Sequence, residues 1–172
     1  MKTISDYIGQ TIKLTQPSFF KHYYELRAGE ELIATLVQPK FFSTASETAG
    51  SFGEWEFYQP GFWRSDIEIR EKGKELPIAK FVSEKWKSRG KLELPKGESF
   101  DIISKKLSWT IDVYNSSQVK ILSFRKKFSF KTDLEINIER RSELLDKYPW
   151  TILLVVYIQL LNERRGAAAA GA

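Results

Sequence analysis

Residues 24–36 read YELRAGEELIATL. Apolar and polar residues alternate up to Gly29, and an apolar-rich segment follows it. Alternation with a period of two is typical of a strand with one buried face, and glycine readily adopts the positive φ of a tight turn. This stretch therefore predicts a β-hairpin.

The hairpin pattern occurs two more times. Residues 67–81 read IEIREKGKELPIAKF and residues 110–124 read TIDVYNSSQVKILSF, so the starts of successive copies are 43 residues apart. Gly73 and Asn115-Ser116 supply the turns of these copies. Each hairpin needs neighbours to cover its apolar face, and several such hairpins can close into a sheet or a barrel. The repeat therefore predicts a mainly β, antiparallel fold.

Short apolar runs between these hairpins predict further strands. No segment before Ser142 has the periodicity of a helix, and no linker or low-complexity tract interrupts residues 1–140. We therefore expect one domain over residues 1–165. The additional strands are expected at residues 11–14, 41–45, 55–58, 91–94, 99–104 and 134–138.

The chain changes character near its C-terminus. Residues 150–161 read WTILLVVYIQLL, and Pro149 suits a first helical turn. A helix that is apolar on every side is either buried or in lipid, and a membrane span needs about 20 apolar residues. This run is shorter and ends at the charged residues 162–165, so it predicts a buried helix, with a β-strand as the alternative. Residues 166–172 are interpreted as an expression scar or a disordered end.

Successive β-hairpins followed by an apolar helix resemble the tubby C-terminal-domain-like superfamily, which includes tubby, the phospholipid scramblases and the LURP-one-related proteins. The resemblance rests on residues 24–36, 67–81, 110–124 and 149–161, and it covers roughly residues 8–165. It implies a closed antiparallel β-barrel of about twelve strands with the helix through its centre. Tubby binds a phosphoinositide headgroup, and the scramblases act at membranes, but no ligand residue of these proteins can be matched here.

Composition excludes several kinds of catalytic site. The chain has no cysteine and one histidine, His22, which rules out a thiolate metal site and a site with two histidines. No phosphate-binding glycine motif is present. We therefore expect no enzyme activity, no metal and no cofactor. The N-terminus carries no signal peptide, which predicts a cytoplasmic protein without a transmembrane span. Reversible docking would place it at the periphery of a membrane.

Acidic and aromatic groups offer weaker candidates. Glu54 with Glu56, and Asp66 with Glu68, are spaced like carboxylate pairs, but alternation on a half-exposed sheet produces such pairs automatically. The aromatic residues around Trp55, including Trp63, could stack on a ligand or pack at a barrel end. We interpret the first group as a solvated face and the second as packing.

Two basic stretches are the strongest functional candidates. One surrounds a tryptophan in an expected loop, and the other belongs to a segment without any acid between Asp112 and Asp133. Brought together, they would attract anions, and a tryptophan among cations suits a lipid interface. The candidate residues are Lys85, Trp86, Lys87, Arg89, Lys91, Arg125, Lys126 and Lys127.

The sequence thus predicts a non-enzymatic module that docks to anionic phospholipid headgroups. The net charge of +5 agrees with an anionic partner. One alternative is a structural or protein-interaction scaffold without lipid affinity. Another is small-molecule binding or hydrolysis at the barrel mouth, which we rank lower because a lumen plugged by a helix has no room for a ligand. No nucleic-acid partner is expected, since no recognition motif is present.

Overall fold

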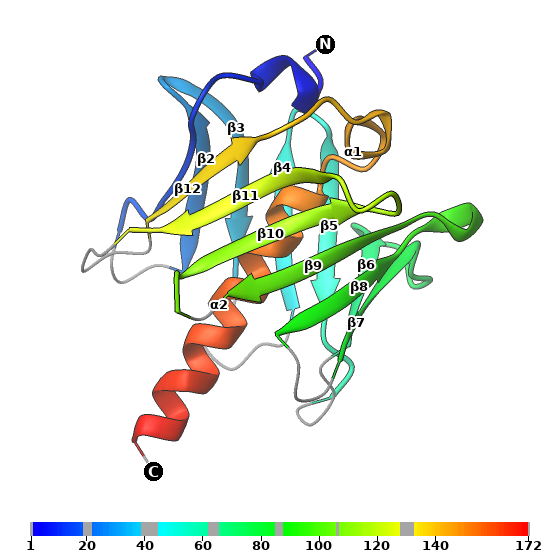
Figure 1. The fold of residues 1–172 in the computed structure, drawn as a ribbon. Helices are drawn as coiled ribbons and strands as arrows, with labels where there is room; N and C mark the ends of the chain where they lie inside the picture. The colour runs from blue at the N-terminus through cyan, green and yellow to red at the C-terminus, as the bar shows by residue number, and fades with distance from the viewer. Residues whose placement is uncertain are drawn as a thin grey trace.

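A computed structural model describes residues 2–18, 22–38, 45–61, 66–84, 88–105, 107–127 and 133–171. Within them, twelve strands form a closed barrel in which each strand lies beside its sequence neighbours and β1 pairs with β12 (Figure 1). The strands pair antiparallel all round the barrel. The mainly β barrel expected from the hairpins is confirmed.

The strands are β1 (Ile12–Thr15), β2 (Tyr23–Ala28), β3 (Glu31–Val37), β4 (Ala45–Gly50), β5 (Gly53–Tyr58), β6 (Ile67–Glu71), β7 (Ala79–Ser83), β8 (Arg89–Glu93), β9 (Ser99–Lys105), β10 (Thr110–Asn115), β11 (Lys120–Lys126) and β12 (Leu134–Ile138). The helices are the 3₁₀ turns η1 (Ile4–Tyr7) and η2 (Pro95–Gly97), and the α-helices α1 (Glu143–Lys147) and α2 (Thr151–Ala170).

The three predicted hairpins are β2–β3, β6–β7 and β10–β11. Gly29 and Gly73 adopt φ values of 56° and 79°, as the turn argument requires. In the third hairpin the Asn115 side chain organises the turn, because its oxygen accepts hydrogen bonds from the backbone N–H groups of Ser117 and Val119.

Strand β4 was largely missed by the sequence pattern. A strand was expected at residues 41–45, of which residues 41–44 lie outside the described residues. The inward positions of β4 are Ser46 and Thr48, which are 0% and 2% exposed. These small polar side chains do not produce the apolar alternation on which the prediction relied.

Helix α2 runs through the barrel lumen (Figure 1). Every residue from Trp150 to Tyr157 is 0% exposed, which confirms the buried helix and excludes the strand alternative. Residues 162–165, which include three charged side chains, do not end the helix as expected, because glutamate, arginine and alanine all favour helical backbone. Residues 166–170 form its last turns. Among the described residues, no helix combines the length and apolar character needed to cross a membrane.

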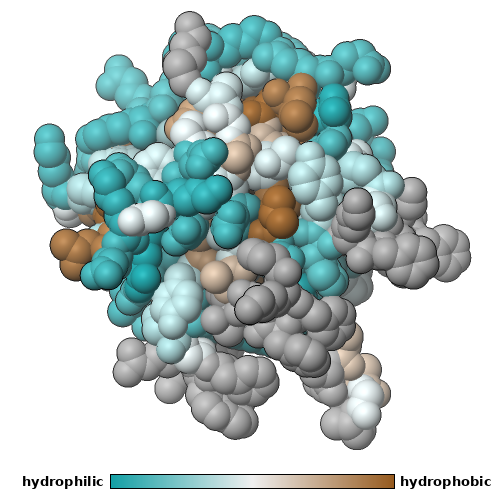
Figure 2. Space-filling model, turned by 180° about the vertical axis from the view of Figure 1, so that it is seen from behind, coloured by the Kyte–Doolittle hydropathy of each residue, from teal (hydrophilic) through white to brown (hydrophobic). Residues whose placement is uncertain are grey.

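The two ends of the barrel differ. The closed end carries the β2–β3 and β4–β5 turns and is covered by η1 and α1, whereas α2 leaves the barrel at the exit end, where β7, β9 and β11 finish (Figure 1). At the closed end, Ser5 N–H donates to Asp146 Oδ1 at 2.7 Å, so η1 and α1 are joined. Seen from the side opposite to Figure 1, the described surface is mainly hydrophilic, with separate small hydrophobic areas (Figure 2).

Candidate functional site

The exit end collects most of the predicted basic residues that the structure describes. Arg89 begins β8, Arg125 and Lys126 finish β11, and Lys127 follows directly. Arg89 and Lys126 line one cavity, so members of the two basic stretches do come together. Lys91 lies further along β8, opposite Asp101 of β9, and does not line the cavity. The candidates Lys85, Trp86 and Lys87 lie outside the described residues.

The cavity lies between α2 and the strand ends of the exit end. Its volume is about 1210 Å³, and α2 contributes Ile158, Leu161 and Glu163 to its lining. We expected a plugged lumen to leave no room for a ligand, and this expectation is wrong for the exit end. Helix α2 fills the lumen tightly only along its apolar first half.

A close packing contact shapes the cavity wall. Gly90 and Phe81 both line the cavity, and a Cβ atom built on Gly90 would lie 2.2 Å from the Phe81 ring. The aromatic ring therefore occupies the space where a side chain of residue 90 would stand. Glycine inside a strand often marks such a close approach.

Two of the predicted cations already have anionic partners. Lys126 Nζ lies 2.6 Å from Glu163 Oε1 of α2 and also stands over the Trp109 ring, 5.5 Å from its centroid. Lys127 is hydrogen-bonded to Glu135 of β12, which raises the pKa of the lysine. The acid-free segment of β11 thus receives its carboxylates from neighbouring elements.

Other cations of the exit end have no such partner. Within the part of the chain that the structure describes, no carboxylate forms an ion pair with Arg89, Arg125 or Arg165. Arg125 is exposed on the barrel exterior, and Arg89 and Arg165 line the cavity. These guanidinium groups are available to an external anion.

The turn between β9 and β10 was not recognised from the sequence. Leu107 is fully exposed, and Trp109 is 50% exposed with a φ of 53°, which is unusual for a bulky residue. Trp109 and Lys105 line the cavity beside α2. The available signal was the order Lys105, Lys106, Leu107, Ser108, Trp109, in which apolar residues follow two cations; Lys106 itself lies outside the described residues.

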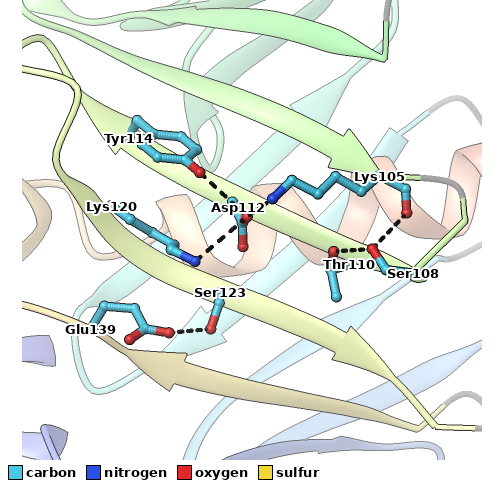
Figure 3. Close-up of polar contacts among 8 residues, drawn as sticks. All are labelled: Lys105, Ser108, Thr110, Asp112, Tyr114, Lys120, Ser123 and Glu139. Atoms are coloured by element: carbon cyan, nitrogen blue, oxygen red, sulfur yellow. Dashed lines mark hydrogen bonds and ion pairs between the residues drawn. The ribbon is translucent and has the colours of Figure 1, made fainter.

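A buried acid on the barrel exterior holds part of this end in place. The Asp112 side chain is 5% exposed and lies 3.1 Å from Lys105 Nζ and 3.7 Å from Lys120 Nζ (Figure 3). The Tyr114 hydroxyl donates to the same carboxylate. The hydrogen bond with Asp112 raises the pKa of Lys105. This cluster is internally paired, so it positions Lys105 and leaves little charge for a ligand.

The weaker candidates from the sequence have ordinary structural partners. Lys72 Nζ lies 3.4 Å from both Glu47 and Glu54, and Lys80 Nζ lies 3.3 Å from Asp66. Arg70 bonds Glu68 at 2.5 Å. These ion pairs agree with a solvated sheet face.

The aromatic candidates pack, and the histidine sits beside a strand. The Trp55 ring lies 6.0 Å from that of Trp150 at the closed end, while Trp63 lies outside the described residues. His22 is half-buried directly before β2. Within the described ranges, no three His, Cys, Asp or Glu side chains form a potential metal site.

Comparison with known proteins gives one informative likeness. No protein-family model and no curated protein matches the chain. The fold is similar to the X-ray structure of the Arabidopsis thaliana protein AT5G01750, with a TM-score of 0.64 and 12% identity over 94% of this chain and 98% of the other. At this identity the likeness concerns the fold alone. The closed barrel with a C-terminal helix that the resemblance implied is thus confirmed at the level of the fold.

Proposed function

We propose that this protein is a non-enzymatic binding module whose exit end docks to anionic phospholipid headgroups at a membrane surface. The observation that carries the proposal is the convergence of exposed Leu107 and Trp109 with Arg89 and Arg125, which form no ion pair with a described carboxylate, at one end of the barrel. Peripheral membrane binding commonly combines inserted apolar side chains with cations, and tryptophan is enriched at the interface. Each basic residue near an anionic surface contributes on the order of 1 kcal/mol.

The structure changes which residues we expect to contact the lipid. Lys126 and Lys127 are engaged by Glu163 and Glu135, so their charge is partly neutralised before any lipid arrives. Lys91 lies on the barrel wall away from the cavity. Leu107, Trp109 and Arg125 therefore replace these lysines as the centre of the proposed docking surface.

The face opposite to that of Figure 1 is mainly polar, which favours this proposal over a scaffold that uses that face as a broad apolar interface. In the view of Figure 2, hydrophobic areas of the described surface are small and separate. Stable protein interfaces usually have an apolar centre that is larger than a single side chain. On that face, the described residues offer no continuous apolar area for a partner.

Cosedimentation with vesicles tests the proposal. Vesicles containing phosphatidylserine are compared with pure phosphatidylcholine across a salt series. Binding should require the anionic lipid and weaken with salt, because exposed charges are screened. The Leu107→Ser, Arg125→Glu double variant should bind at least about tenfold more weakly, since 1.4 kcal/mol corresponds to tenfold.

The closed end supplies matched controls. Leu76 is 81% exposed in the β6–β7 connection, and Arg140 is exposed after β12. The Leu76→Ser, Arg140→Glu double variant should sediment like the wild type. Equal losses in the two double variants, or no wild-type binding at low salt, would overturn docking through the exit end. The second result would leave a scaffold without lipid affinity.

A further inference from the structure

The cavity of the exit end has a largely apolar wall. Phe81, Ile102 and Ile111 contribute from three strands and Ile158 from α2, and each of these side chains is at most 7% exposed. At about 1210 Å³ the cavity exceeds the roughly 300–1,000 Å³ of ordinary ligand pockets. The apolar part of this lining can pack against a hydrocarbon chain.

The rim of the cavity is basic. Arg89, Lys105, Lys126 and Arg165 line it, together with the acids Glu84 and Glu163. Glu163 is engaged by Lys126, whereas Arg89 and Arg165 form no ion pair with a described carboxylate. Guanidinium groups bind carboxylate and phosphate in a bidentate manner, so the rim complements an anionic headgroup.

We infer that this cavity binds one acyl chain of an anionic amphiphile, with the chain along α2 and the headgroup at the rim beside Arg89 and Arg165. The ligand class is a single-chain lipid such as a fatty acid. The inference deepens the proposed function and rests on it for the source of the ligand, because a docked membrane brings such lipids to the exit end. Burial of the chain is favourable because it removes hydrocarbon from water.

Trp109 provides a reporter for this site, because it lines the cavity. The probe is a dibrominated stearate below its micelle concentration, without vesicles, since bromine quenches tryptophan fluorescence on contact. We expect saturable quenching in the wild type. The Trp109→Phe variant should lose most of the quenching while calorimetry still detects binding.

Two variants fill the cavity and keep the fold. Ser104 lines the cavity and is half-buried, so Ser104→Phe places a ring in its space. Gly166 also lines it, and a Cβ atom there would meet nothing within 4 Å, so Gly166→Trp tests the same space from α2 without a clash. Each variant should bind the stearate at least about tenfold more weakly, with unchanged thermal unfolding.

The headgroup is tested separately. Arg165→Glu should weaken stearate binding by about tenfold, and a cationic amphiphile with the same chain should bind wild type at least tenfold more weakly than stearate does. Equal affinity for both amphiphiles, or unchanged binding in both filled variants, would overturn the inference.

Vesicle docking and chain binding can fail independently, because Leu107 and Arg125 do not line the cavity. Wild-type protein that sediments with anionic vesicles but is not quenched by stearate refutes chain binding and leaves docking intact. Quenching without sedimentation supports the cavity and refutes docking.

Discussion

The two ends of this barrel are built from different interactions around the same helix. At the closed end, Trp150 is fully buried, and its ring lies 6.0 Å from that of Trp55 and 5.9 Å from that of Tyr148. At the exit end, α2 is held by polar contacts, in which Lys126 meets Glu163 and Arg164 donates to Gln38. The first half of α2 is therefore core, and the second half is one wall of a cavity.

This difference suggests that residues of the closed end determine the stability of the fold and residues of the exit end determine the proposed binding. The closed half of α2, from Trp150 to Tyr157, is fully buried, so changes there should act on folding. Among the described residues, the exit end has a cavity, guanidinium groups without a carboxylate partner and the exposed Leu107 and Trp109, so changes there should act on binding. The following predictions test that division.

The largest effect is expected from a charge in the closed half of α2. Leu154 is 0% exposed, and Leu154→Asp should unfold the domain because a buried, unpaired charge costs several kcal/mol. Thermal unfolding followed by circular dichroism measures this effect. Asn162→Asp introduces the same charge in the exposed half of α2 and should change the melting temperature little. Normal stability of Leu154→Asp would refute the helix-filled lumen.

A second effect appears only in alkaline solution. Burial raises the pKa of Tyr157 to about 12, above its ordinary value of 10.0, so the fold favours the neutral phenol. This stabilisation is complete below about pH 10 and is lost as the pH rises towards 12. The shift corresponds to about 3 kcal/mol. The free energy of unfolding is measured in urea across this pH range. It should fall less for Tyr157→Phe than for the wild type. An equal fall in both proteins would contradict a raised pKa of Tyr157 in the folded state.

Alanine substitutions at one glycine near each end compare how tightly the two ends are packed. A Cβ atom on Gly50 would lie 2.8 Å from the Ile33 carbonyl oxygen, whereas the nearest obstacle to one on Gly90 is the Phe81 ring beside the cavity. Either change to alanine should cost about 1–3 kcal/mol. The ring can move, so Phe81→Leu should relieve part of the cost at Gly90, where the Val82 carbonyl oxygen also lies 3.0 Å from the added Cβ atom. A double-mutant cycle by urea unfolding that shows no coupling would contradict this contact.

The smallest effect concerns the exit of α2. Glu163→Gln removes the ion pair with Lys126. Both side chains of this pair are about a quarter exposed, so its loss should lower the free energy of unfolding by at most about 1 kcal/mol. Hydrogen exchange should become faster in the last turns of α2 and stay unchanged from Trp150 to Tyr157. The matched change Glu143→Gln in α1 should alter neither region. Faster exchange along the whole helix would show that its two halves are not independent.

Periodicity explains why the sequence predicts most of this fold. The hairpins and the helix carry regular apolar patterns because their buried faces are made of large side chains. Strand β4 lacks that pattern, since Ser46 and Thr48 face inward. The helix also continues past the expected stop at residues 162–165, because those residues favour helix even where they leave the core.

The candidate site was only partly predictable, because its parts come from distant segments. Charge counting along the chain identified Lys126 as available, but its partner Glu163 is 37 residues away and meets it only in the closed barrel. The cavity depends on how Phe81 covers Gly90 and on where α2 leaves the lumen, which no local pattern contains. The sequence shows that Leu107 and Trp109 are apolar residues near two lysines. Their role in the proposed docking surface follows from their exposure, which only the structure shows.

Hydrogen exchange with and without anionic vesicles tests the division between the two ends most directly. We expect slower exchange in the β9–β10 turn, at the end of β11 and in residues 158–166 of α2 when vesicles are present. The turn at Gly29 and helix α1 should exchange at the same rate in both conditions. Protection at the closed end with none at the exit end would contradict the account.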